Sequence, residues 1–454
     1  MGYLLQNGGL GMAGDWIITG GRPLQGRVEV PAAKNSVLPL LAAALLCSGP
    51  VRLQNVPRLT DVEDCLALLR GVGCTAGWQG AALAVQGQPM RTDLAPEAAG
   101  RMRASILFCA PLLARLGRVN TVLPGGCRIG ARPIDLHLQG LAQMGVRQLP
   151  AAPGQLTLYA PAGLRGAEIC LAFPSVGATE TLLLAAATAQ GQTVLHGAAK
   201  EPEIVDLAAF LNACGGCVEG AGTDTIRVQG RRCLAGCTFA PMADRIIAST
   251  LACAAAAAGG RVELAGCAPG LYAPLLEILE QMGCTVERAN GAAAISRFGA
   301  LRGAGNVHTA PYPGLATDAA PLLAAVMLCA QGESSLQDRV FENRFACAGG
   351  FAALGANVRV AERTLYVQPA GALHGAKLTA PDLRGGAALV VAALAARGSS
   401  RLDGVELVRR GYAELDRLLA GLGAQIWQEI PARRGLAKKT PMKKQFCLAI
   451  GAKK

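Results

Sequence analysis

The clearest pattern along the chain is a series of apolar segments that end at a glycine and are followed by a strand-like run. Typical frames are LAQMGVRQL at 141–149 and LAGLGAQIW at 419–427. A glycine directly after a helix ends it, because that position needs a left-handed backbone. Each frame therefore predicts a helix, a glycine stop and a strand. The six glycines of this first series, spaced by 68 to 72 residues, are Gly73, Gly145, Gly215, Gly283, Gly355 and Gly423.

A second series of glycines interleaves with the first. Its frames include LLCSGPVRL at 45–53 and AAAGGRVEL at 256–264. Two series in step predict six units of about 70 residues, each running helix, Gly, strand, helix, Gly, strand. The members of this second series, spaced by 66 to 74 residues, are Gly49, Gly117, Gly191, Gly260, Gly332 and Gly398.

The helices that precede the second series are apolar on nearly every face. Examples are the segments at 37–47, 246–258 and 389–396. A helix that is apolar all round is buried. The sequence therefore predicts an α/β fold with helices inside and sheets outside, in which the six units form two groups of three with a cleft between them.

The composition is that of a large globular protein. The chain has 454 residues, which suggests two or three domains, and 52% of them are hydrophobic, which argues against disorder. Apolar runs stay below the ~18 residues of a membrane span, so we expect no membrane insertion. The 16 cysteines lack the spacing of a disulfide framework, and the N-terminus lacks the features of a signal peptide. We therefore expect a reduced, cytoplasmic protein.

The net charge of +12 is concentrated at the C-terminus. Six of nine lysines lie in the last 17 residues, and with Arg433 and Arg434 this segment carries eight positive charges, leaving +4 on the body. A nucleic-acid-binding protein would show basic residues across a face of its body, so we expect no nucleic-acid partner. We interpret 431–454 as a disordered basic tail, and the mild arginine excess of the body as fitting a small polyanionic substrate.

Lys34 and Asn35 stand directly before a predicted buried helix. Lys34 is one of three lysines ahead of the tail. A lysine at a helix start can meet an anion together with free backbone N–H groups, which makes the pair a candidate anion site. The other interpretation is a polar helix start at which Asn35 only caps.

Cys127 lies on a glycine-flanked loop beside Arg128 and near Arg132. Neighbouring positive charge lowers the pKa of a thiol and raises its reactivity. Most other cysteines sit in apolar runs, where they act as small hydrophobes. Cys127 is therefore the candidate reactive thiol, against the simpler interpretation of a loop cysteine without function.

Four further cysteines have a spacing similar to that of zinc ligands. They follow C-x-x-C and C-x-x-x-C patterns, but two of them fall at a helix end and the strand after it, as apolar residues do in other units. We therefore expect no metal site, and no dinucleotide or P-loop fingerprint follows a strand either. The four are Cys214, Cys217, Cys233 and Cys237.

Acidic and basic residues precede further predicted helices. Asp318 comes directly before a predicted buried helix, and Asp382 with Arg384 holds the equivalent place one unit later. Arg410 stands at another helix start. Such residues are usually helix caps or surface charges, so the pattern alone leaves a catalytic role open.

These stretches together resemble the UDP-N-acetylglucosamine 1-carboxyvinyltransferases, the enolpyruvyl transferases of bacterial peptidoglycan synthesis. The resemblance covers about residues 16–428. It implies two inside-out α/β barrel-like domains, each of three repeats, which agrees with the six units. The motifs that carry it are NVPRLTDV (55–62), RASI (103–106), PGGCRIGARPIDLH (124–137), SVGATE (175–180), EPEIVDLA (201–208), FENRF (341–345), DLR (382–384) and RGY (410–412).

The resemblance implies transfer of enolpyruvyl from phosphoenolpyruvate to the 3′-hydroxyl of UDP-N-acetylglucosamine, without metal or cofactor. Cys127 would donate a proton to the methylene carbon, and Asp318 would accept the proton of the sugar hydroxyl. Lys34, Arg132 and Arg410 would hold substrate anions. Residues expected to bind the UDP-sugar or to place the reacting groups are Asn35, Arg103, Arg132, Pro133, Ile134, Asp135, Leu136, Ser175, Val176, Gly177, Val340, Asp382 and Arg384.

The same resemblance suggests a division into domains and an oligomeric state. We predict an N-terminal extension at 1–12, one domain from 13–32 plus 243–430, a second domain from 33–242, and the tail. We expect a monomer or a weak homo-oligomer.

The chain also departs from the family pattern at several positions. Phe173, Ile247, Ala319 and Arg409 stand where the family has other residues. These differences keep two other interpretations in view: a slow or inactive paralogue that binds UDP-sugar and regulates a partner, and a 3-phosphoshikimate 1-carboxyvinyltransferase.

Overall fold

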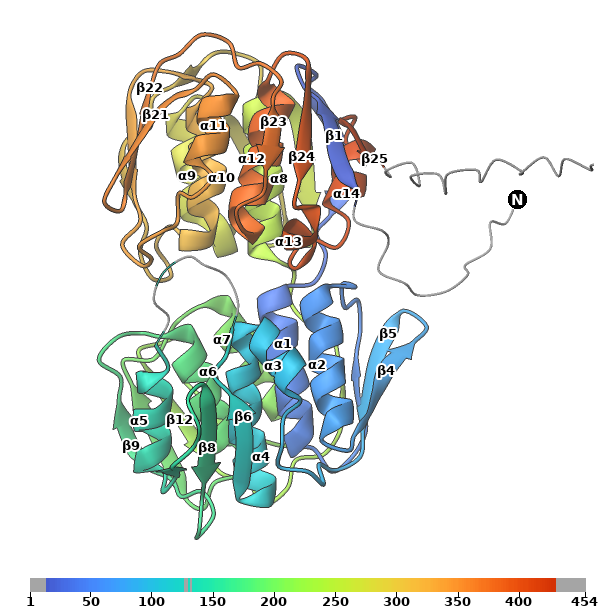
Figure 1. The fold of residues 1–454 in the computed structure, drawn as a ribbon, viewed down its shortest axis with the longest axis vertical. Coiled ribbons are helices and arrows are strands. Elements are labelled where there is room, and N and C mark those ends of the chain that lie inside the picture. Colours follow the sequence, from blue (N-terminus) through green and yellow to red (C-terminus); the bar gives the residue numbers. More distant parts are fainter. Residues whose placement is uncertain (1–13, 126–129, 131–132, 430–454) are drawn as a thin grey trace, which may run out of the picture.

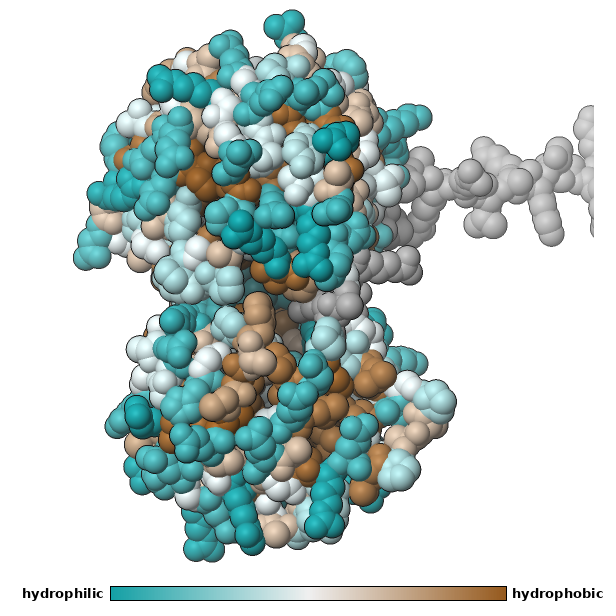
Figure 2. Space-filling model, turned by 90° about the vertical axis from the view of Figure 1, so that its left-hand side faces the viewer, coloured by the Kyte–Doolittle hydropathy of each residue, from teal (hydrophilic) through white to brown (hydrophobic). Residues whose placement is uncertain are grey.

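The computed structural model describes residues 14–125, 130 and 133–429. These residues form two lobes that meet at a narrow waist (Figures 1 and 2). Each lobe has its own apolar core. The upper core in Figure 1 draws on residues 16–30 and 246–426, and the lower core on residues 37–234. In the described part of the chain, no helix has the length and apolar character needed to cross a bilayer.

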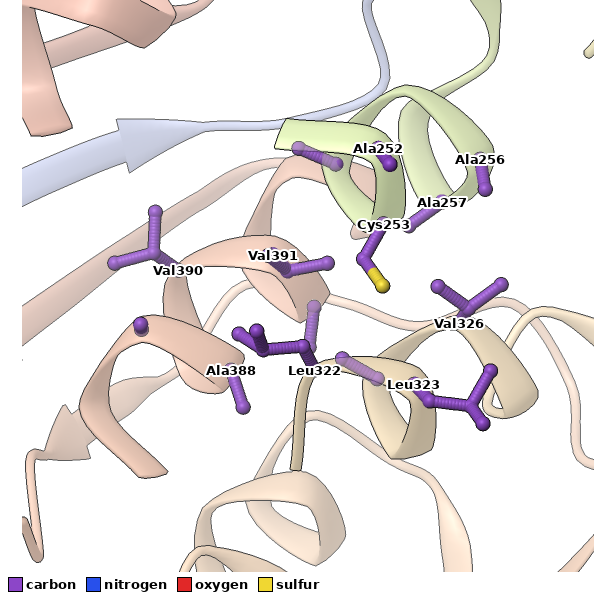
Figure 3. Packing of buried hydrophobic residues seen from close by; sticks show 14 of the residues in the cluster. Ala252, Cys253, Ala256, Ala257, Leu322, Leu323, Val326, Ala388, Val390 and Val391 are labelled. Atoms are coloured by element: carbon purple, nitrogen blue, oxygen red, sulfur yellow. The ribbon is translucent and has the colours of Figure 1, made fainter. Parts of the chain in front are cut away.

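Three central helices fill the upper lobe: α8 (Arg245–Ala258), α10 (Ala320–Met327) and α12 (Leu383–Ala395). Their small and branched side chains interdigitate directly (Figure 3). Cys253 of α8, Leu322 of α10 and Val391 of α12 are fully buried. Other helices or sheets cover nearly every face of these three helices, which explains why their residues are apolar on nearly every face.

Three four-stranded sheets surround these helices. The first orders β23 (Lys377–Thr379), β24 (Ser399–Asp403), β1 (Asp15–Thr19) and β25 (Gln425–Glu429). The second orders β15 (Thr285–Ala289), β16 (Ala292–Arg297), β14 (Gly260–Ala265) and β2 (Leu24–Glu29). The third orders β18 (Gly305–His308), β20 (Ser334–Gln337), β22 (Thr364–Gln368) and β21 (Asn357–Ala361), with a small pair β17 (Leu301–Arg302) and β19 (Ala330–Gln331) nearby in sequence.

The lower lobe repeats this plan. Its inner helices are α1 (Lys34–Ala43) with η1 (Ala44–Leu46), α4 (Cys109–Leu116) preceded by α3 (Pro96–Arg101) and η2 (Arg103–Phe108), and α6 (Val176–Ala186). Its sheets order β13 (Thr238–Phe239), β3 (Val51–Leu53), β5 (Ala82–Gln86) and β4 (Thr75–Gln79); β11 (Val218–Glu219), β12 (Thr225–Gln229), β10 (Gln192–His196) and β9 (Glu168–Cys170); and β6 (Arg118–Val122), β8 (Gln155–Tyr159) and β7 (Arg147–Leu149).

The glycines of the first series end the outer helices, as predicted. All six have φ between 87° and 107°. In the second series only Gly117 caps a helix, at the end of α4, whereas Gly260 is the first residue of β14 and Gly332 follows β19, so the predicted helix stop is wrong for most of this series. Gly49 is the one member without positive φ. A Cβ there would lie 3.0 Å from the Gly236 nitrogen, so close backbone approach requires this glycine instead. The outer helices are α2 (Thr60–Gly71), α5 (Asp135–Gln143), α7 (Pro202–Ala213), α9 (Ala273–Gln281) after η3 (Pro269–Tyr272), α11 (Ala348–Ala353) and α14 (Leu415–Gly421), with α13 (Val405–Arg409) before the last.

The fold class expected from the sequence is confirmed: helices lie inside and sheets outside in both lobes. Within the described residues the three sheets of a lobe are not hydrogen-bonded into one closed barrel. The strand β1 pairs with β24 and β25, with Trp16 opposite both Leu402 and Gln428. This pairing places the first strand of the described residues in the upper lobe, beside the last strand of the described residues.

Candidate active site

The N-termini of helices from both lobes meet at the waist. Lys34 begins α1, and its backbone N–H donates to Asp244 Oδ2 across the lobes at 3.2 Å. The other oxygen of Asp244 caps α8 by accepting from the N–H groups of Ile246 and Ile247. Asp382 caps α12 in the same way. Helix N-termini carry partial positive charge, so this junction favours anions.

Asp61 of α2 links two of the predicted site residues. Its buried carboxylate lies 2.6 Å from Lys34 Nζ and 3.0 Å from Arg410 Nε. Arg410 follows α13 in the upper lobe and also donates to the Arg101 carbonyl at 3.2 Å. Two cations share one carboxylate, so the group keeps a net charge of +1. Burial favours a raised pKa for Asp61, but Lys34 and Arg410 outweigh it and lower the pKa.

Asp318 lies just ahead of α10, in η4 (Thr317–Ala319), and is held between two arginines. Its Oδ1 lies 3.1 Å from Arg344 Nη2, and its Oδ2 lies 3.0 Å from Arg384 Nη2. Burial opposes ionisation, but Arg384 and Arg344 prevail and hold the pKa of Asp318 well below its usual range. The lowered pKa keeps the carboxylate ionised. About a quarter of the Asp318 side chain is exposed, so the carboxylate is also accessible.

The Asp318 group and the Asp61 group belong to one junction. Asp244, which binds the Lys34 backbone, also interacts electrostatically with Arg384. Beside it, Arg245 of α8 makes a buried two-point ion pair with Glu203 of α7, at 3.0 and 3.2 Å. This ion pair connects α8 of the upper lobe to α7 of the lower lobe, close to Asp244 and Arg384, and so holds the two lobes together at the junction.

The predicted nucleotide-binding residues lie together at the starts of α5 and α6. Ser175 Oγ caps α6, while Pro133 and Ile134 lead into α5. The helices touch through Gly177, where a Cβ would lie 3.0 Å from the ring of His137. Arg103 Nη2 donates to the Pro133 carbonyl at 2.6 Å, which brings a cation to this edge. The remaining members of the stretch are Asp135, Leu136 and Val176.

Val340 is tied to a neighbouring turn through its backbone, whereas the Asn35 side chain is exposed. The Val340 N–H donates to Asp338 Oδ1 at 2.8 Å, so this donor is already used. Asp338 is fully buried and accepts from Thr317 Oγ1 at 2.5 Å, which ties the Val340 segment to the turn that carries Asp318. The Asn35 side chain, next to Lys34, is exposed.

Cys127 and Arg132 lie outside the described residues. Gly130 of the same loop is described and lies against Glu342 of the upper lobe. Its φ is +135°, and a Cβ there would overlap the Glu342 carboxylate. The positive φ favours glycine at this contact, which brings Gly130 of the lower lobe against the FENRF segment of the upper lobe.

Sequence reasoning missed two residues of the site. Asp61 stands inside the NVPRLTDV motif but resembles an ordinary acidic residue in a first helical turn, and Arg344 sits unremarked in FENRF. The available signal was an acidic or basic residue within a recognised motif. In the structure Asp382 is the N-cap of α12, because its Oδ1 accepts from the N–H groups of Arg384 and Gly385.

Comparison with known proteins agrees with this architecture. The family model of EPSP synthase (3-phosphoshikimate 1-carboxyvinyltransferase) matches residues 18–419. The UDP-N-acetylglucosamine 1-carboxyvinyltransferase of Nitratidesulfovibrio vulgaris is 42% identical over 414 residues, covering 91% of this chain and 99% of the relative. The enzyme of that name, numbered 1, from Symbiobacterium thermophilum is 41% identical over 422 residues, covering 90% of this chain and 94% of its own.

Solved structures show the same fold. The enolpyruvyl transferase NikO from Streptomyces tendae superposes with a TM-score of 0.80 at 27% identity, covering 91% of this chain and 99% of its own. An EPSP synthase from Acinetobacter baumannii reaches a TM-score of 0.69 at 20% identity over 91% of this chain and all of its own, which supports the fold alone. The chain therefore belongs to the EPSP synthase family and, within it, to the UDP-N-acetylglucosamine 1-carboxyvinyltransferases.

Proposed function

We propose that the protein transfers the enolpyruvyl group of phosphoenolpyruvate to the 3′-hydroxyl of UDP-N-acetylglucosamine and releases phosphate, the first committed step of peptidoglycan precursor synthesis. The observation that carries this proposal is the junction where Lys34 and Arg410, from different lobes, converge on Asp61. Both substrates are polyanions, and charge-assisted bonds to lysine and arginine are the strong means of holding phosphate and carboxylate.

The anion site would consist of Lys34, Arg410 and Arg132. Asp61 neutralises one charge and fixes the direction of the first two, so it is a positioning residue. The remaining +1, together with the N-termini of α1 and α8, leaves the junction attractive to an anion. Preorganised charge of this kind stabilises developing negative charge without a metal ion, so we expect no cofactor.

Asp318 would act as the proton acceptor for the sugar 3′-hydroxyl. A lowered pKa keeps it ionised but makes it a weak base. Proton transfer would therefore accompany attack of the hydroxyl oxygen on C2 of phosphoenolpyruvate, when the hydroxyl itself becomes acidic. Arg344 and Arg384 would orient the carboxylate during this step.

Cys127 would donate the proton that C3 of phosphoenolpyruvate gains in this addition. The product is a tetrahedral intermediate that carries both phosphate and sugar at C2. Loss of a proton from C3 then expels phosphate and restores the double bond. Contact between Gly130 and Glu342 supports a loop that closes over the site between the lobes, which would exclude water.

The UDP-sugar would span both lobes. Arg103, with Pro133 to Leu136 and Ser175 to Gly177, would hold the nucleotide, while Asn35 would help to place the reacting groups. The Val340 carbonyl would hold the sugar, because its N–H already serves Asp338. Phe173, which is 47% exposed two residues before Ser175, would leave the nucleotide site without one family cation.

We also propose the cellular setting and the domain limits. The two separate cores support domains of 13–32 plus 243–430 and of 33–242, flanked by the extension at 1–12 and the tail at 431–454. The enzyme would act in the cytoplasm, as a monomer or weak homo-oligomer, where phosphoenolpyruvate and nucleotide sugars are available.

A phosphate-release assay tests the function directly. We expect phosphate from phosphoenolpyruvate with UDP-N-acetylglucosamine, and none with either substrate alone or with shikimate 3-phosphate as the acceptor. Equal rates with both acceptors would contradict the assignment of the acceptor. Binding of UDP-N-acetylglucosamine without phosphate release would indicate an inactive paralogue.

A further inference from the structure

Three cysteines that are far apart in the sequence gather where α1, α7 and β13 meet. Cys47 follows η1, Cys214 follows α7, and Cys237 precedes β13. Backbone hydrogen bonds fix this arrangement: the Ala235 N–H donates to the Cys214 carbonyl at 2.8 Å, and the Ser48 N–H donates to the Leu234 carbonyl at 2.8 Å. The proposed catalytic machinery makes no use of this cluster.

Cys214 and Cys237 are the closest pair. Their Sγ atoms lie 3.1 Å apart, about 1 Å beyond the length of a disulfide bond. Cys214 is completely buried, whereas Cys237 is partly exposed. The pair therefore has one thiol that a small oxidant can reach and one that can only respond from inside.

We propose that Cys214 and Cys237 are a site of reversible oxidation, at which a peroxide converts the two thiols into an intramolecular disulfide. The Cys237 sulfur would attack one peroxide oxygen, break the O–O bond and become a sulfenic acid, with release of water. The Cys214 sulfur would then attack the sulfenic sulfur and expel a second water. Two thiols lose two electrons and two protons, and one hydrogen peroxide becomes two waters.

Oxidation at this pair would be slow compared with an exposed thiol. Burial, together with the neighbouring Cys214 thiol, raises the pKa of Cys237 to about 12, so little thiolate is present at neutral pH. Cys47 is buried next to Cys214, and the interaction between these two thiols, with burial, raises the pKa of Cys214. Cys47 is therefore the competing partner that the experiment must distinguish.

The disulfide would affect stability more than catalysis. It would close the segment between the end of α7 and β13, which contains the hairpin of β11 and β12. The end of α7 lies about 17 Å along the helix from Glu203 at the waist. We expect the oxidised protein to unfold at a Tm about 5 °C higher, because the cross-link restricts the unfolded chain, with kcat/KM for phosphate release unchanged.

Mass mapping of the full-length protein tests the proposal. Trypsin would leave Cys217 with Cys214 and Cys233 with Cys237, so the base protein is the double variant Cys217→Ser/Cys233→Ser. After peroxide treatment, alkylation of free thiols and digestion without reductant, we expect one linked peptide pair containing Cys214 and Cys237, which a reductant separates. The added variant Cys237→Ser should lose both the linkage and the Tm shift.

Two outcomes would overturn the proposal. One is full alkylation of Cys214 and Cys237 in the unfolded protein after the exposed Cys170 has been oxidised. The other is a linkage of Cys214 to Cys47. In case Cys237→Ser does not fold, Cys237→Ala provides the same comparison, and the linkage in the base protein decides the result by itself.

Discussion

Asp61 of the lower lobe holds Arg410 of the upper lobe through a contact of 3.0 Å between Oδ1 and Nε. The two residues are 349 positions apart in the sequence. The same carboxylate binds Lys34 Nζ at 2.6 Å, so one buried acid sets the positions of two cations that the proposed reaction needs. Its removal would leave the buried Lys34 and the partly exposed Arg410 without the carboxylate that they share.

We first predict that Asp61→Asn lowers kcat for phosphate release by about 10- to 100-fold, equivalent to roughly 1.4–2.7 kcal/mol. The amide keeps the shape but loses the charge that aligns Lys34 and Arg410. KM for phosphoenolpyruvate should change less than kcat, because the substrate anion itself attracts both cations. Steady-state phosphate release measures both constants.

A surface variant serves as its control. Asp224→Asn removes an exposed carboxylate whose partner, Lys200, is 3.6 Å away. Exposed pairs of this kind contribute little, so its kcat should equal that of the wild type. An unchanged kcat in Asp61→Asn would show that the cations hold their positions without this carboxylate.

A second prediction concerns acid stability. Lys34 and Arg410 overcome the effect of burial and lower the folded-state pKa of Asp61. Its stabilising contribution is therefore complete above the unfolded pKa of about 4 and is lost as pH falls through the folded pKa. Urea unfolding between pH 3 and 7 should show a smaller acid-dependent loss of stability in Asp61→Asn than in the wild type. Parallel curves for the two proteins would contradict this.

A third prediction concerns Glu180, a buried carboxyl on α6. Within the described residues it has no ion pair or hydrogen bond from its side chain, and burial, with Glu203 and Glu201, raises its pKa well above normal. A raised pKa means that stability is lost as pH rises from the unfolded value of about 4 toward the folded one. Glu180→Gln removes this loss, so its Tm should exceed that of the wild type at pH 8 and approach it at pH 5.

The exposed Glu219 offers a matched comparison, since Glu219→Gln should leave Tm unchanged at both pH values. A lower Tm of Glu180→Gln at pH 8 would mean that the charged carboxylate is stabilised by a partner.

A fourth prediction identifies the reactive thiol. A phosphonate-bearing epoxide should label Cys127 first, because neighbouring arginines would bind the anion and favour the thiolate. UDP-N-acetylglucosamine should accelerate labelling by closing the loop. Peptide mass mapping after brief exposure, with and without the nucleotide sugar, measures this selectivity.

Two other thiols provide the internal control. Cys170 and Cys233 are exposed and should react with a neutral epoxide but gain nothing from the phosphonate. Equal phosphonate labelling of these residues and Cys127 would refute Cys127 as the reacting thiol.

A fifth prediction separates the tail from the fold. Glu429 pairs with Asp15 in the sheet and forms an ion pair with Arg401 at 2.6 Å, so a cut after Gln428 would remove part of β25. A cut after Ile430 leaves β25 complete and removes only the basic tail. This truncated protein should therefore keep kcat/KM and Tm close to those of the full chain. Activity and thermal unfolding of the 1–430 protein give the result, and a large loss of either would assign the basic tail a role in the enzyme.

The sequence by itself determined the repeat, the buried helices and the segments that form the site. These follow from local signals: Gly283 and Gly355 stop helices because their φ is positive, and α8 is buried because its residues are apolar on nearly every face. Such rules act over one or two helical turns, so they can be applied without knowledge of the fold.

Only the tertiary structure decided which charges face one another. In the sequence Asp61 resembles an ordinary acidic residue at a helix start, and only the fold shows that Arg410 of the other lobe binds it. Likewise, only the fold shows that Arg344 forms an ion pair with Asp318. Cys214 and Cys237, which suggested a zinc spacing, lie side by side as a thiol pair. Coulombic and hydrogen-bonding energies depend on distance and burial, and both are fixed only when distant segments pack together.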